Sequence, residues 1–136
     1  MPSLGIYAAN EYHNGTSTEQ GALTLNLQNS IVYTERNNAI QFKPTTGQTF
    51  NYFIENCLVK FDAANAGFTW DGNTKIVNSS KNEDPKFENY FSQKMNLRVK
   101  ATSPAKAKGK VSTAVLVPLD LVKVNRTSNP TIGAYQ

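Results

Sequence analysis

The sequence contains one cysteine and one histidine, and this scarcity excludes several classes of protein. Cys57 has no second cysteine to pair with, so the chain cannot build a small secreted fold held by internal disulfides. His13 has no second histidine, so a metal site of several histidines cannot form within one copy. We expect Cys57 to be a buried apolar side chain in a strand and His13 to be an exposed loop residue.

Long hydrophobic runs are also missing. The opening segment MPSLGIYAANEYHNG has no basic region followed by an apolar stretch, as a secretory signal would. Nowhere does the sequence approach the roughly 20 apolar residues that cross a membrane. We therefore expect a soluble protein of the cytoplasm or of a virion, with no secretory signal and no membrane partner.

Motifs for phosphate binding and catalysis are lacking as well. Neither GxGxxG nor GxxxxGK[ST] occurs, so no glycine-rich phosphate loop is present. The acidic residues show no local spacing that indicates a catalytic carboxylate pair. We predict that the protein is not an enzyme and that it has no catalytic residue, no cofactor, no metal ion and no small-molecule substrate.

What remains is the composition of an ordinary globular domain. A chain of 136 residues can bury roughly two-thirds of the surface that it exposes when unfolded. Hydrophobic residues make up 39% and charged residues 18%, and the low mean hydropathy reflects sixteen asparagines more than charge. No linker divides the chain and no internal repeat is expected, so residues 1–136 are treated as one domain.

Period-two alternation is the strongest structural signal, and it indicates strands with one buried face. Leu23, Leu25 and Leu27 alternate with Thr24 and Asn26. Further strands are expected at 40–42, 50–61, 95–102 and 111–117, the last two as the arms of one hairpin.

One segment departs from this pattern. Asp84 can cap a helix that has Pro85 at its first position, and Phe87, Tyr90 and Phe91 then fall on one helical face. We predict a single short helix near residues 84–93. Seven or eight short strands with this helix favour an all-β fold, namely a single-domain antiparallel sandwich of the jelly-roll type. An OB-like barrel is the alternative.

The basic residues are distributed unevenly. Residues 1–90 hold six Lys and Arg against nine Asp and Glu, whereas residues 91–136 hold eight against one. Alternation in the carboxyl-terminal hairpin predicts a positive face that contacts nucleic acid or an acidic patch on another copy. A solvated hairpin whose lysines prevent edge pairing is the simpler interpretation. The residues predicted to form this face are Lys94, Arg98, Lys100, Lys106, Lys108 and Lys110.

Together these features favour a non-enzymatic structural protein that self-assembles, such as a capsid, decoration or tail subunit of a phage-like virion. Its ends, such as the segment 128–136, would act as arms that contact neighbouring copies. One alternative is a single-stranded nucleic-acid-binding protein on an OB-like barrel. A second is a carbohydrate-binding β-sandwich built around Trp70 and nearby tyrosines.

Overall fold

The computed structural model describes residues 4–136, in which strands are the main regular secondary structure and helix is scarce. The all-β expectation is therefore confirmed. Twelve strands lie within these residues: β1 (Ile6–Ala9), β2 (Glu11–His13), β3 (Thr18–Gln20), β4 (Leu23–Gln28), β5 (Ile31–Val32), β6 (Ile40–Lys43), β7 (Phe50–Glu55), β8 (Leu58–Val59), β9 (Ile76–Val77), β10 (Ser80–Lys81), β11 (Phe87–Asn89) and β12 (Asn96–Val99). The helical elements are α1 (Ala63–Ala66), a 3₁₀ turn at Ser92–Lys94 and α2 (Val111–Leu116).

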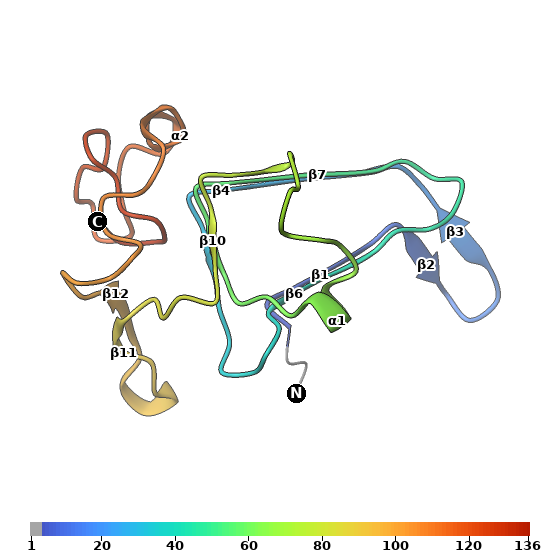
Figure 1. Ribbon diagram of the computed structural model, residues 1–136, viewed down its shortest axis with the longest axis horizontal. Coiled ribbons are helices and arrows are strands. Elements are labelled where there is room, and N and C mark those ends of the chain that lie inside the picture. Colours follow the sequence, from blue (N-terminus) through green and yellow to red (C-terminus); the bar gives the residue numbers. More distant parts are fainter. Residues whose placement is uncertain (1–3) are drawn as a thin grey trace.

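Most of these strands pair in parallel, which contradicts the expected antiparallel sandwich and the OB-like barrel. The parallel sheets are β1–β6, β4–β7–β9 and β5–β8–β10. In Figure 1 these three sheets surround a common core, because the chain winds past all three sides before it returns to the first. The architecture is a short parallel β-helix of three coils. Alternating side chains indicate a half-buried strand, but they fit parallel and antiparallel pairing equally well.

The middle coil holds the centre of the core. Ile40 and Ile54 are fully buried there. Along one column Leu27 of the first coil pairs with Ile54, and Ile54 pairs with Ile76 of the third coil. Both outer members of this column are only partly buried. Each coil therefore completes the burial of its neighbour, and the two end coils are covered on one side only.

The end of the β-helix formed by the third coil differs from the end formed by the first. Beside β6 it places the helix α1 instead of a strand, and Gly67 follows this helix with a φ angle of 77°. A Cβ atom on Gly67 would lie 2.0 Å from the carbonyl oxygen of Phe42. Phe68 then stacks on Phe42 with 4.5 Å between ring centroids. The close passage of this helix over β6 thus requires glycine, and aromatic rings close this end of the core.

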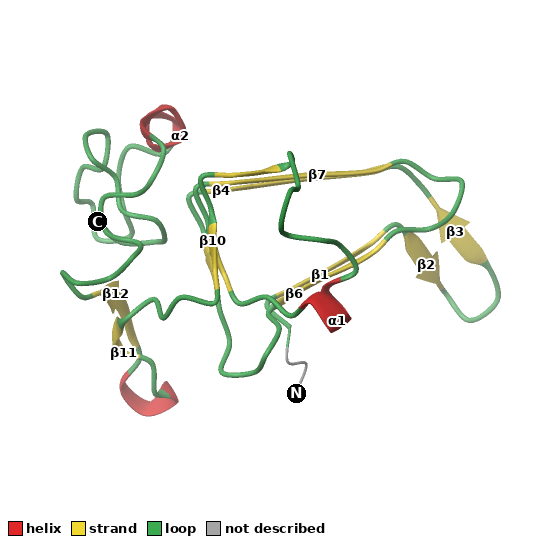
Figure 2. Ribbon diagram, in the orientation of Figure 1, coloured by secondary structure: helices red, strands yellow, loops and turns green. Residues whose placement is uncertain are grey.

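Residues 84–136 form a second layer that we call the C-terminal module. It lies beside the β5–β8–β10 sheet in Figure 1, and Figure 2 shows that most of it is loop. Leu58 faces outward from β8 and is fully buried against Ala105 and Ile132 of the module. The module is therefore packed on the β-helix through an apolar contact.

The predicted helix near residues 84–93 is wrong. The Asp84 carboxylate accepts the Lys86 N–H at 2.8 Å, and Lys86 has a positive φ of 53°, so the chain turns here instead of entering a helix. The strand β11 follows, and Phe87 and Tyr90 pack on Tyr33 of the first coil. The aromatic spacing that suggests a helical face instead serves a contact with the β-helix.

The predicted carboxyl-terminal hairpin is also wrong. The strand β12 pairs with β11, which precedes it, and not with the segment that follows it. That segment forms the helix α2. No helix within residues 4–136 combines the length and apolar character needed to cross a membrane.

Candidate functional site at the asparagine corner

One corner of the β-helix repeats the same local structure in all three coils. Asn29, Asn56 and Asn78 have φ angles of 47°, 50° and 48°, and each turns the chain from one side of the β-helix to the next. Asparagine adopts this left-handed conformation more readily than most residues. The sequence carries the repeat as LQNSIV, IENCLV and IVNSSK. Our expectation of no internal repeat is therefore wrong, because equivalent residues are 27 apart in one step and 22 apart in the next.

The residue after each corner asparagine fixes the turn. Ser30, Cys57 and Ser79 each donate a hydrogen bond to the carbonyl oxygen two residues earlier, over 2.7, 3.2 and 2.9 Å respectively. Ser79 also accepts the N–H of Cys57 at 3.0 Å and so connects two coils. A small hydrogen-bonding side chain after asparagine is thus the local signature of the corner.

Cys57 is fully buried, as expected, but it lies in the corner between β7 and β8 and not in a strand. Burial raises the pKa of its thiol to about 11, because the charged thiolate would lose its hydration. We predict that Cys57 does not react with a thiol reagent such as Ellman's reagent at neutral pH while the protein is folded, since only the thiolate attacks. The same reagent should label it fully in concentrated urea. Rapid labelling of the folded protein would contradict this burial.

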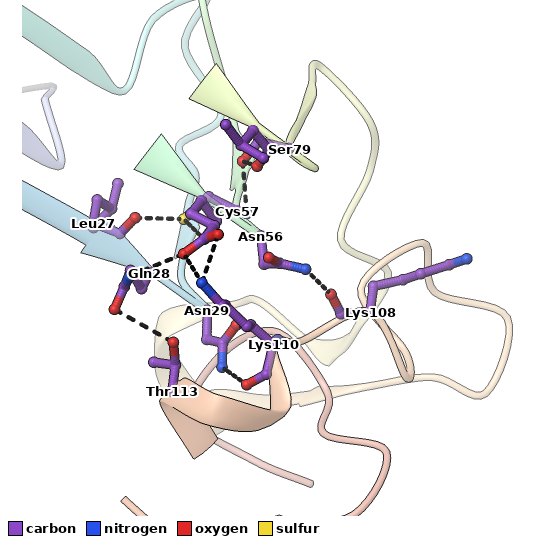
Figure 3. Close-up of polar contacts among 11 residues, drawn as sticks. Leu27, Gln28, Asn29, Asn56, Cys57, Ser79, Lys108, Lys110 and Thr113 are labelled. Carbon is purple, nitrogen blue, oxygen red and sulfur yellow. Dashed lines mark hydrogen bonds and ion pairs between the residues drawn. The ribbon is translucent and has the colours of Figure 1, made fainter. Parts of the chain in front are cut away.

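Two of the corner asparagines bind the C-terminal module (Figure 3). The side-chain amide of Asn29 donates to the Lys110 carbonyl at 3.0 Å and accepts the Lys110 N–H at 2.6 Å. The Asn56 amide donates to the Lys108 carbonyl at 2.8 Å. Within residues 4–136 the Asn78 side chain has no corresponding bond. The corner is therefore both the turn of the β-helix and its attachment point for the module.

An ion pair reinforces this attachment. The Lys110 ammonium lies 2.8 Å from the Glu55 carboxylate, which is buried and also accepts a hydrogen bond from Gln28. Lys110 was predicted to face an anionic partner, and here it is neutralised by a carboxylate of its own chain. Sequence alternation could not reveal this contact, because the two residues are 55 positions apart.

The other predicted cations lie on several different elements. Lys94 ends the 3₁₀ turn and Arg98 lies in β12, with its guanidinium 4.9 Å from the centre of the Tyr135 ring. Lys100 lines a depression that also contains Glu35 and Asp84, and Lys108 lines another that contains Glu83. Lys106 lies in the loop between them. They do not share one face of a hairpin, and contact with an anionic partner stays a prediction.

The end of the chain has its own polar network, which the sequence did not suggest. The Asp120 carboxylate accepts the N–H groups of Val122, Val124 and Gln136 at 2.8, 2.8 and 2.9 Å. Burial acts to raise the pKa of Asp120, but these hydrogen bonds outweigh it and lower the pKa below 3.8. Arg126 donates to two carbonyls of the same segment, those of Thr131 and Gly133. This network holds the segment 128–136 against the rest of the C-terminal module.

Residues 4–136 contain no group of three or more His, Cys, Asp and Glu side chains that could hold a metal ion. His13 is exposed, as expected, but it ends the strand β2 and is not a loop residue, and its Nε2 lies 2.8 Å from the Glu11 carboxylate. Comparison of the chain with protein-family models, with curated proteins and with solved structures finds no match.

Proposed function

We propose that this protein is a non-enzymatic structural module that self-assembles through the first-coil end of its β-helix. The observation that carries the proposal is the incomplete burial of this coil. Within residues 4–136 its strands β1, β4 and β5 each have a neighbour on one side only. Leu25 and Leu27, which pack on the core from this coil, are partly exposed, whereas Ile54 of the middle coil is fully buried.

The strand β4 supplies the longest free edge. Leu23 donates its N–H to the Thr49 carbonyl on the β7 side at 2.9 Å. Because backbone groups alternate along a parallel strand, the N–H groups of Thr24 and Asn26 face away from β7. An edge of this kind pairs with any further strand that reaches it. The other end of the β-helix is less suited to stacking, because α1 occupies the place of a strand beside β6.

The occupant proposed for this edge is a second copy of the chain. When the same end of two copies meets, a two-fold symmetric dimer results, and the half-buried leucines of both copies are covered together. A further apolar surface is present on the C-terminal module, where Leu116 and Leu121 are 79% and 71% exposed. Exposed apolar side chains of this size support contact between copies in a larger assembly.

Several kinds of assembly fit this proposal. A capsid, decoration or tail subunit of a virion is one, and a filament is another. The cations that remain without an ion pair within residues 4–136, such as Lys106 and Arg98, supply a contact with nucleic acid or with an acidic surface of a neighbouring copy. The mass of the native particle distinguishes these assemblies.

The substitution Asn26→Pro tests the edge directly. Proline removes the N–H that faces away from β7 and leaves the pairing with β7 in place. We expect the wild-type protein to form oligomers by light scattering over the micromolar range, and the proline variant to shift toward the monomer. Asn26→Ala is the matched control, because it keeps the N–H and should assemble as the wild type does. A monomeric wild-type protein, or a proline variant that assembles equally well, would overturn the proposal.

A further inference from the structure

A cavity of about 480 Å³ lies between the first coil and the C-terminal module. The first coil contributes Tyr33 and Glu35, and the module contributes the rest of the lining. Ligand pockets are frequent where two parts of a protein meet. The remaining lining residues are Asp84, Lys86, Phe87, Tyr90, Lys100 and Thr102.

Three aromatic rings form one wall of the cavity. Phe87 and Tyr90 are stacked, with 5.7 Å between their centroids and an interplanar angle of 11°. Tyr33 meets both of them edge-on, at 6.4 and 6.0 Å. All three rings are partly exposed, so they leave apolar surface open to a ligand.

The charged groups of the cavity balance one another. Glu35 and Asp84 bring two carboxylates, and Lys86 and Lys100 bring two ammonium groups. Burial raises the pKa of the Tyr33 phenol, and the negative charges of Asp84 and Glu35 add to this effect. The cavity thus offers hydrogen-bond acceptors and donors in equal measure and has no net charge.

The backbone at this cavity is also unusual. Lys86 has a φ of 53°, a conformation that a side chain with a Cβ adopts at a cost. It is held there by the Asp84 carboxylate on its N–H and by its own ammonium, which donates to the Thr102 carbonyl at 3.0 Å. Strained backbone that is fixed by polar contacts is concentrated at binding sites.

From these features we infer that the cavity binds a neutral saccharide. The aromatic wall provides surface on which the apolar face of a sugar ring stacks, and the carboxylates and lysines bind its hydroxyl groups. The balanced charge disfavours an anionic polymer, because two carboxylates and two ammonium groups line the same cavity. This inference does not depend on self-assembly, since the cavity is formed within one chain.

The test uses the full-length protein and calorimetric titration with hexasaccharides of glucose, xylose, mannose and galactose. A hexasaccharide of galacturonic acid serves as the acidic arm. We expect saturable binding of at least one neutral hexasaccharide and weaker binding of the acidic one. Tyr90→Ala should weaken the binding by about tenfold. Tyr12→Ala is the matched control, because Tyr12 is 66% exposed on a remote hairpin and should leave the affinity unchanged.

A second variant keeps the inference testable if Tyr90→Ala does not fold. Asp84→Asn keeps an oxygen that can accept the Lys86 N–H but removes the charge, so the turn should persist while the affinity falls severalfold. The inference is overturned if none of the neutral hexasaccharides binds the wild-type protein. It is also overturned if the acidic hexasaccharide binds best, or if both Tyr90→Ala and Asp84→Asn bind as the wild type does.

Discussion

Substitution of alanine for Gly67 should cost about 4 kcal/mol of unfolding free energy, the largest loss that we expect from a single methyl group. Two causes combine. The φ of 77° is unfavourable for any residue with a Cβ, which costs about 1–2 kcal/mol. In addition, the new Cβ would lie 2.0 Å from the Phe42 carbonyl oxygen, so α1 would have to move away from β6. The measurement is urea unfolding followed by circular dichroism.

Gly72→Ala is the matched control for this prediction. Gly72 has a nearly identical φ of 74°, but no other atom lies within 4 Å of the position its Cβ would take. This variant should therefore lose only the conformational part, about 1–2 kcal/mol. Equal losses of unfolding free energy in the two variants would show that the contact between α1 and β6 does not determine the structure of the β-helix at its third-coil end.

The second large effect is expected from Asn29→Gly. Glycine keeps the left-handed turn without strain, so the variant removes the amide and leaves the corner intact. The two hydrogen bonds to Lys110 should then be lost, which costs about 2–3 kcal/mol because the Lys110 backbone groups remain partly buried. Hydrogen exchange should show faster opening of the C-terminal module than of the middle coil.

Asn78→Gly supplies the control, since Asn78 has the same φ but no bond to the module within residues 4–136. It should lose only the small entropic cost of glycine, about 0.5–1 kcal/mol. If Asn29→Gly and Asn78→Gly have equal stability, the side-chain amide of Asn29 does not attach the module. The comparison separates attachment from turn formation, which a single variant could not do.

Local sequence patterns predicted several strands of the β-helix correctly but not their partners. The alternation of Leu23, Leu25 and Leu27 marks β4 correctly, because a strand with one buried face requires it. The partner of β4 is β7, some 27 residues later, and the pairing is parallel. Nothing in a period of two specifies direction, so an antiparallel sandwich was expected where the chain in fact winds onward.

The asparagines were the signal that could have revealed the β-helix. Sixteen copies are present, and three of them precede Ser or Cys at equivalent points of successive coils. The repeat is hidden because the coils differ in length, and the β2–β3 hairpin is inserted in the first. Each asparagine adopts its backbone conformation locally. That the three positions are equivalent becomes visible only when the coils are stacked.

The charged residues also show which features the sequence reveals and which only the structure reveals. The sequence correctly located the excess of Lys and Arg in residues 91–136, because that is a matter of counting. It could not show that Lys110 pairs with Glu55, since this contact exists only when the module lies against the corner. The cavity beside Tyr33 was missed for the same reason, because its residues come from two distant segments.

The sequence by itself determined that this is a β protein, where several strands of its β-helix lie, and that Cys57 is buried, because these follow from side-chain alternation and from the burial preference of apolar groups. The tertiary structure alone decided the direction of pairing, the division into a β-helix and an attached module, and the sharing of charges between them. These depend on contacts between residues tens of positions apart, and a local pattern carries no information about which distant segment will be brought beside it.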